Sequence, residues 1–299
     1  MERTTRPAIA FAVAAAGIGF FSLMDAVMKD LVLALGAYNA VLWRCMVGSV
    51  IAGALFVGTR QRWPEGQVLR LHAWRSMVVS IMAISFFWGL GRLPLAEAIG
   101  LSFIAPVIAL YLAAILLGEK IGREAIFASV AGLGGVAIIL FGKFSGDYDN
   151  KALPGVAAVL FSAIVYAYNL VLARQQAQVA GPVEIAFFQN LLVSAVLMLA
   201  GPWLLKPIAL STLPMLTAAA ALAIIALLLL SWAYARAEAQ ILIPVEYTAF
   251  VWAALFGWMF FAEPVTVWTV AGTALIVAGS LVAARVKPYP VNQVEMAST

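Results

Sequence analysis

The strongest constraint in this sequence is a series of long apolar runs, roughly ten of them, separated by short polar breaks. A run of roughly 20 apolar residues can cross the hydrocarbon core of a bilayer as a helix. The runs are continuous and do not alternate polar with apolar residues, which favours helices over a β-barrel. The expected spans are residues 8–28, 37–57, 72–91, 96–117, 124–142, 154–173, 183–204, 209–233, 239–261 and 266–284.

The composition excludes a soluble fold. Hydrophobic residues make up 65% of the chain and charged residues only 11%, whereas a soluble domain carries about 25% charged residues. So few charges cannot cover the surface of a chain of 299 residues. The apolar side chains must therefore face lipid, and we expect an all-α integral membrane protein with ten transmembrane helices.

The charged residues lie mostly in the short breaks and predict an orientation. Placing the N-terminus in the cytoplasm leaves most Lys and Arg on the cytoplasmic side, as in other membrane proteins, so both termini are expected there. The apolar run that follows Arg6 continues to Lys29. That is too long for the core of a typical secretory signal, so the run is expected to be a retained first span. The sequence has no clustered basic face interleaved with aromatics, which excludes nucleic acid as a partner.

The two halves of the sequence repeat one pattern. Glu119 and Glu263 lie 144 residues apart, and Arg92 and Arg236 keep the same separation. Each half then holds five spans, and an odd number forces the second copy to enter the membrane in the opposite orientation. Inverted repeats of this kind are typical of transporters. We expect a first five-helix repeat over 1–149, a second over 150–287 and a disordered cytoplasmic tail over 288–299.

Motifs for catalysis, metal binding or nucleotide binding are missing from the sequence. It contains no His-Glu-x-x-His, P-loop or Gly-x-Ser-x-Gly pattern. His72 is the single histidine, and its place near the inner end of the third span predicts an interfacial residue. Cys45 is the single cysteine, so the chain cannot form an internal disulfide. The chain is therefore expected to be no enzyme and to need no cofactor or metal.

Two charged residues interrupt the first and second spans. A charge at the centre of a span costs about 2.5–3.5 kcal/mol, and Asp25 and Arg44 are both expected somewhat outward of that centre. In one interpretation they form an ion pair that braces two helices, and in the other Arg44 receives the carboxylate of a substrate. We assign Asp25 and Arg44 a structural or gating role.

Prolines interrupt the fourth span and its counterpart in the second half, the ninth. Pro106 and Pro244 each free a backbone carbonyl and kink a helix. Such kinks are either ordinary membrane-helix curvature or hinges for opening and closing. We assign Pro106 and Pro244 to gating.

Glu246 is a further charge inside a span, and the repeat aligns it with Ser102. A carboxylate here can carry a proton or bind a substrate amine, or it can face a wet cavity with hydrogen bonds to aromatic residues. Polar and aromatic side chains near the middle of other spans can line the same cavity. The predicted substrate-binding residues are Phe86, Ser102, Phe103, Tyr166, Asn169, Trp232, Glu246 and Tyr247.

Three parts of the sequence resemble the EamA family of the drug/metabolite transporter superfamily. They are the segment 22–29 with the following Trp43-Arg44, the stretch from Pro94 to Lys120, and Phe261 to Pro264. The resemblance covers nearly the whole chain. It implies ten helices with both termini in the cytoplasm, and export or exchange of small metabolites through a central cavity. Within the family the chain is most similar to exporters of aromatic and other amino acids.

The resulting functional hypothesis is export of amino acids, aromatic and other apolar ones among them, by alternating access in a bacterial inner membrane. The resemblance also leaves open an importer of a metabolite such as riboflavin or S-adenosylmethionine. A membrane scaffold that transports nothing is the alternative from another class. The expected partners are a small-molecule substrate and the lipid bilayer, with the chain as a monomer or a weak homodimer.

Overall fold

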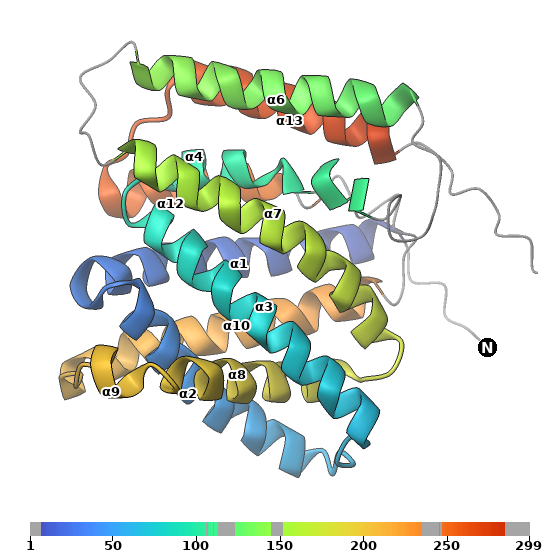
Figure 1. The fold of residues 1–299 in the computed structure, drawn as a ribbon, viewed down its shortest axis with the longest axis vertical. Coiled ribbons are helices and arrows are strands. Elements are labelled where there is room, and N and C mark those ends of the chain that lie inside the picture. Colours follow the sequence, from blue (N-terminus) through green and yellow to red (C-terminus); the bar gives the residue numbers. More distant parts are fainter. Residues whose placement is uncertain are drawn as a thin grey trace, which may run out of the picture.

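The chain folds into a bundle of helices, some of which, such as α6 and α13, run across the view while α3 and α7 cross it obliquely (Figure 1). A computed structural model describes residues 7–105, 107–109, 111–112, 123–144, 152–234, 245 and 247–284. No strand occurs among these residues. The helices are α1 Pro7–Leu35, α2 Ala37–Gly58, α3 Gly66–Leu90, α4 Leu95–Ser102, α6 Arg123–Phe144, α7 Ala152–Ala177, α8 Pro182–Met198, α9 Gly201–Leu204, η1 Leu210–Thr212, α10 Leu213–Tyr234, α12 Thr248–Phe261 and α13 Val267–Ala284.

Most helices pack against a helix that is distant in sequence. The most extensive contacts join α6 with α13, α1 with α10, α3 with α7, and α2 with α8. In Figure 1, α6 and α13 lie side by side along one edge of the bundle. The main cluster of buried residues draws on α1 to α4 together with α6, α7, α8, α10, α12 and α13, so one core joins both parts of the chain.

The bundle has two ends, which we name after residues in their turns. The Gly36 end carries the turn between α1 and α2, at the left of Figure 1, and the Trp63 end carries the turn between α2 and α3, at the lower right. Gly36 has φ 78°, a conformation that glycine adopts without steric cost. Its N–H donates to Val32 O at 2.8 Å, so the chain reverses within a single residue.

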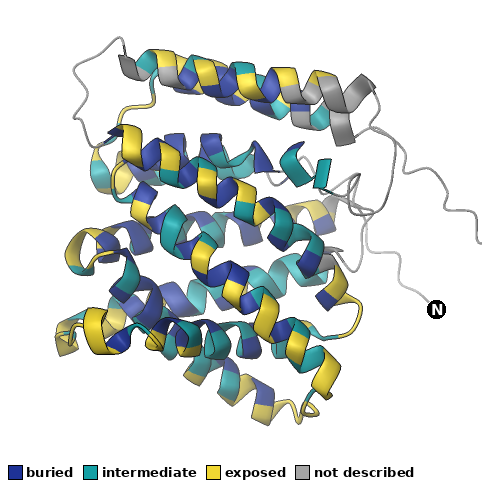
Figure 2. Cartoon of the chain, in the orientation of Figure 1, coloured by how far each residue is buried: buried dark blue, intermediate teal, exposed yellow. Residues whose placement is uncertain are grey.

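The surface of the bundle is apolar over its length. Exposed and partly exposed residues alternate with buried ones along every long helix (Figure 2). Val50, Val57 and Trp203 are 74%, 75% and 81% exposed, and large apolar surfaces of this kind are stable only against lipid or a partner. Within the described residues, five helices are long and apolar enough to cross a membrane, and five shorter apolar helices accompany them.

The structure corrects several boundaries expected from the sequence; the span expected over 183–204, for example, is α8, which ends at Met198, followed by the short α9. The first helix continues to Leu35 rather than ending at residue 28, and the third begins at Gly66 rather than at residue 72. Lys29 was expected in an outer loop, but it lies inside α1 and is only 4% exposed. The helix continues past this charge because Lys29 finds polar partners inside the protein.

Helices α6 and α13 cross at a pair of glycines. A Cβ atom added at Gly135 would lie 2.4 Å from Gly272 O, and one added at Gly272 would lie 2.5 Å from Gly135 O. Only glycine allows two backbones to approach this closely. Small residues at such crossings let helices associate through dense packing, which is the main attraction available in lipid.

Candidate functional site

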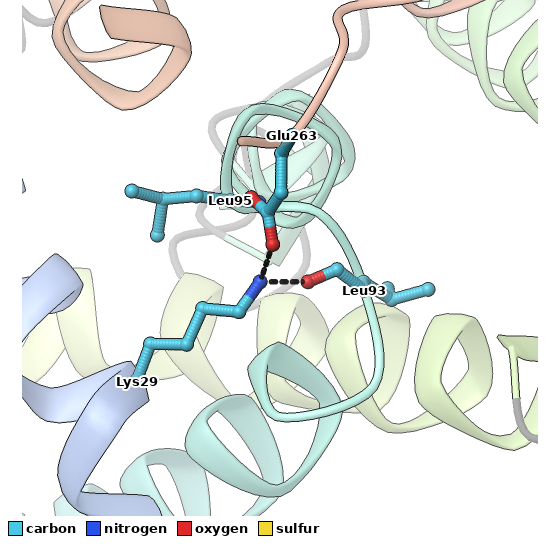
Figure 3. A network of polar contacts seen from close by, with 4 residues as sticks. All are labelled: Lys29, Leu93, Leu95 and Glu263. Carbon is cyan, nitrogen blue, oxygen red and sulfur yellow. Dashed lines mark hydrogen bonds and ion pairs between the residues drawn. The ribbon is translucent and has the colours of Figure 1, made fainter. Parts of the chain in front are cut away.

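A buried ion pair closes the Gly36 end of the bundle (Figure 3). Nζ of Lys29, on α1, donates to a carboxylate oxygen of Glu263 and to Leu93 O, the latter at 2.5 Å. The other oxygen of Glu263 accepts the N–H of Leu95 at 2.7 Å. Because Leu95 is the first residue of α4, this carboxylate also satisfies an unpaired donor at a helix N-terminus. One network therefore joins α1, the α3–α4 connection and the end of α12.

The end of α12 is shaped so that Glu263 reaches this network. Ala262 adopts the left-handed conformation with φ 51°. The N–H of Ala262 then donates to Trp258 O, and that of Glu263 donates to Gly257 O, both at 3.1 Å. The bond from Ala262 to Trp258 is that of the αL motif, which ends a helix and turns the chain sharply. The turn places the Glu263 carboxylate against α4, 3.0 Å from the position that a Cβ on Gly257 would occupy.

A second polar network lies toward the Trp63 end, between α3, α7 and α8. Arg75 Nε donates to Asn169 Oδ1 at 3.0 Å, and its Nη1 donates to Gln176 Oε1. Nε2 of Gln176 lies 2.6 Å from His72 Nδ1, and His72 Nε2 lies 3.0 Å from Glu184 Oε1. If Gln176 donates to Nδ1, the ring proton sits on Nε2 and points at the Glu184 carboxylate. His72, Asn169 and Gln176 are all buried, so His72 is not the interfacial residue expected from the sequence.

Gln176 connects the two halves of this network, and its removal is a test of it. Gln176→Leu should lower the free energy of unfolding by about 2 kcal/mol, because an Arg75 donor and His72 Nδ1 lose a buried partner. The measurement is denaturant unfolding in mixed micelles. Gln175→Leu changes an exposed neighbour on the same helix and should cost less than about 0.5 kcal/mol. Equal losses for the two variants would show that the network adds no stability.

Between the two networks lie Asp25 on α1 and Arg44 on α2. Neither is exposed and neither is fully buried, and the charge of Arg44 acts on the Asp25 carboxyl group. The ion pair considered from the sequence does not form, because the ion pairs within 4.0 Å in the described part of the chain are Lys29–Glu263 and His72–Glu184. Their role as structural or gating residues stays a prediction.

The structure brings together only some of the predicted substrate-binding residues. Phe103, directly after α4, packs edge-to-face on Tyr247 with 5.2 Å between ring centroids. Asn169 is part of the Arg75 network, and Tyr166 lies on the same helix, α7, where it is 37% exposed. These four residues belong to two separate contact groups.

The other predicted residues lie elsewhere or are not described. Phe86 contacts Phe87, with ring centroids 5.3 Å apart. Ser102 donates its hydroxyl to Ala98 O at 2.8 Å. Trp232 packs against a small apolar cluster that includes Val245. Glu246, Pro106, Pro244 and the predicted tail 288–299 lie outside the described residues.

The buried polar networks are the features that the sequence interpretation missed. Lys29 and Glu263 had both been noticed, but only as boundaries of spans and as markers of the repeat. Arg75 and Glu184 lie close to predicted span ends, where charges are expected to reach water. The Lys29–Glu263 pair could have been predicted from opposite charges at a similar depth in the membrane. Lys29 lies near the end of the first span, and Glu263 follows the ninth.

A bundle of long apolar helices with exposed apolar surfaces and buried charged networks is the architecture of a multi-pass membrane protein. The sequence profile of the EamA-like transporter family matches residues 7–141 and again residues 153–285. The chain therefore belongs to the EamA family of transporters, which confirms the resemblance. Each of the two polar networks joins residues of the first matched segment to residues of the second.

Relatives of known or assigned function span most of the chain. The pseudopaline exporter CntI of Pseudomonas aeruginosa is 25% identical over 271 residues, which cover 89% of this chain and 93% of the exporter. A riboflavin transporter of Rhizobium johnstonii is 27% identical over 213 residues, covering 70% of this chain and 68% of the relative. A protein of known crystal structure has a TM-score of 0.61 to this chain, at 19% sequence identity. The match covers 92% of this chain and 95% of that protein's chain, so the two share a fold.

Proposed function

We propose that this transporter exports amino acids, aromatic and other apolar ones among them, from the bacterial cytoplasm across the inner membrane by alternating access. One observation carries the proposal: two buried polar networks at opposite ends of the bundle each join the two segments that match the family. A movement that opens one end of the bundle would break the network at that end and can leave the other intact. That is the property required of two gates that open in turn.

The proposal includes two inverted repeats of five helices with both termini in the cytoplasm. The packing partners support a two-fold relation between the segments. If α1 corresponds to α7 and α3 to α10, the α1–α10 contact corresponds to the α7–α3 contact, and both are among the most extensive in the bundle. The α2–α8 and α6–α13 contacts then each join a helix to its own counterpart. An interface between such copies is where transporters bind their substrates.

The direction of transport is argued from the P. aeruginosa relative, which is an exporter. The similarity to a riboflavin transporter supports a second candidate function, the uptake of a flavin-like metabolite. Amino acids are favoured because the described interior presents an acid and a base together, Asp25 and Arg44, which suits a ligand that carries both charges.

The test is counterflow in proteoliposomes loaded with unlabelled amino acids, using radiolabelled L-phenylalanine, L-leucine and riboflavin outside. We expect saturable accumulation of the two amino acids, with no accumulation in protein-free liposomes. Accumulation of riboflavin alone, in liposomes loaded with riboflavin, would replace the proposal by the uptake candidate. No saturable movement of any of the three would favour a scaffold.

A further inference from the structure

Asp25 and Arg44 differ from Lys29, Arg75 and Glu263, charged groups of the two polar networks, because neither makes an ion pair or a strong hydrogen bond within the described part of the chain. Asp25 makes no hydrogen bond or ion pair with another described residue. Nη2 of Arg44 donates only to Cys45 Sγ at 3.4 Å, and a thiol sulfur is a weak acceptor. Nε of Arg44 is buried and has no partner at all.

This is not how the rest of the bundle treats its charges. Lys29 has a carboxylate and a carbonyl as partners, and Arg75 has two side-chain amides. A buried polar group without a partner costs about 1–3 kcal/mol, and more when it is charged. Lys29 and Arg75 thus have strong hydrogen-bond partners among the described residues, whereas Asp25 and Arg44 do not. This difference suits the binding of a ligand that supplies the missing partners.

Asp25 and Arg44 lie on α1 and α2, two helices that contact each other. Each side chain keeps some accessible surface, and Asp25 does so between its buried neighbours Met24 and Ala26. The Arg44 charge acts on Asp25, so the two groups border the same region. From the Gly36 turn, Asp25 is about 16 Å and Arg44 about 12 Å deep at a rise of 1.5 Å per residue.

We propose that Asp25 and Arg44 bind the two charged ends of a zwitterion, Asp25 the ammonium group and Arg44 the carboxylate. The guanidinium can donate two parallel hydrogen bonds to a carboxylate, which fixes the orientation of the ligand. A ligand that carries only a negative charge would be repelled by Asp25. A ligand that carries only a positive charge would be repelled by Arg44. Either ligand would leave one protein charge without a partner, so the site selects ligands that carry both.

This inference rests on the proposed amino-acid transport but has its own test. Ligand binding is measured by thermal stabilisation of the purified full-length protein in detergent, with each of the twenty amino acids. The best-bound amino acid is then compared with its amide, which lacks the carboxylate, and with its deamino acid, which lacks the ammonium group. In the wild-type protein we expect both analogues to bind at least about tenfold more weakly.

The variants assign each end of the ligand to a residue. Arg44→Gln should remove the preference for the amino acid over its amide, and Asp25→Asn should remove the preference over the deamino acid. Each variant should keep the other preference, which a merely misfolded protein would not do. Asp30→Asn and Arg62→Gln change exposed residues of the same charge and should keep both preferences.

Three results would overturn the site. They are a wild-type protein that no amino acid stabilises, analogues that bind as well as the parent, and variants that keep the wild-type preferences. The proposed function fails separately. If amino acids bind with the expected preferences but do not move in proteoliposomes, transport is wrong and the site stands. If they move while Asp25 and Arg44 variants keep wild-type preferences, transport stands and the site is wrong.

Discussion

Replacing Glu263 with Leu will lower the free energy of unfolding by about 3 kcal/mol. The variant leaves the Lys29 ammonium, only 4% exposed, without its counter-charge, and it removes the acceptor of the Leu95 N–H. Removing one partner of a buried ion pair is strongly destabilising because the remaining charge stays away from water. Denaturant unfolding in mixed micelles measures the loss.

The matched variants separate this ion pair from a general effect of losing a carboxylate. Glu65→Leu removes an exposed carboxylate at the start of α3 and should change stability by less than about 0.5 kcal/mol. The double variant Lys29→Leu with Glu263→Leu removes both charges and should recover more than half of the loss, since a buried ion pair can be replaced by apolar side chains at little cost. A double variant as unstable as Glu263→Leu alone would show that the charges are not coupled.

Much of the fold was predictable because membrane helices follow from composition. The apolar runs placed α2 to within one residue at its end, and predicted the regions of α7, α10 and α13 closely. The larger errors, at α1 and α3, share one cause. A charge was taken as the end of a span, but α1 continues past Lys29 and α3 begins before Arg70. A charge marks the end of a membrane helix only if it has to reach water.

The candidate site was less predictable, because it depends on contacts between segments that are distant in sequence. The sequence drew attention to Asp25 and Arg44, since charges inside apolar runs stand out. It could not show that they remain unpaired, because that depends on how α1 and α2 pack. Lys29 and Glu263 are 234 residues apart, and only the folded bundle shows that they meet. The partners of His72 on α7 and α8 were hidden for the same reason.

Gly135→Ala will separate α6 from α13 and lower the free energy of unfolding by about 3 kcal/mol, the upper part of the range for overpacked sites. The added methyl group would lie 2.4 Å from Gly272 O and 2.5 Å from Ile276 Cγ1. The carbonyl belongs to the backbone, so it cannot move aside as a side-chain terminus can. The two helices must part instead, and the dense packing that holds them in lipid is lost.

Gly134→Ala is the matched control, one residue away on the same helix. Its nearest neighbour would be Leu275 Cδ2 at 3.4 Å, an ordinary contact. Alanine also has the better helix propensity, by about 1 kcal/mol in water, so Gly134→Ala should leave stability unchanged or raise it. Unfolding of both variants in mixed micelles gives the comparison. If Gly135→Ala were as stable as Gly134→Ala, the helices would not cross at the Gly135–Gly272 contact.

Ligand binding should not depend on this crossing, because α6 and α13 make little contact with α1. The folded fraction of the Gly135→Ala protein should therefore still bind the amino acid in preference to its amide and its deamino acid.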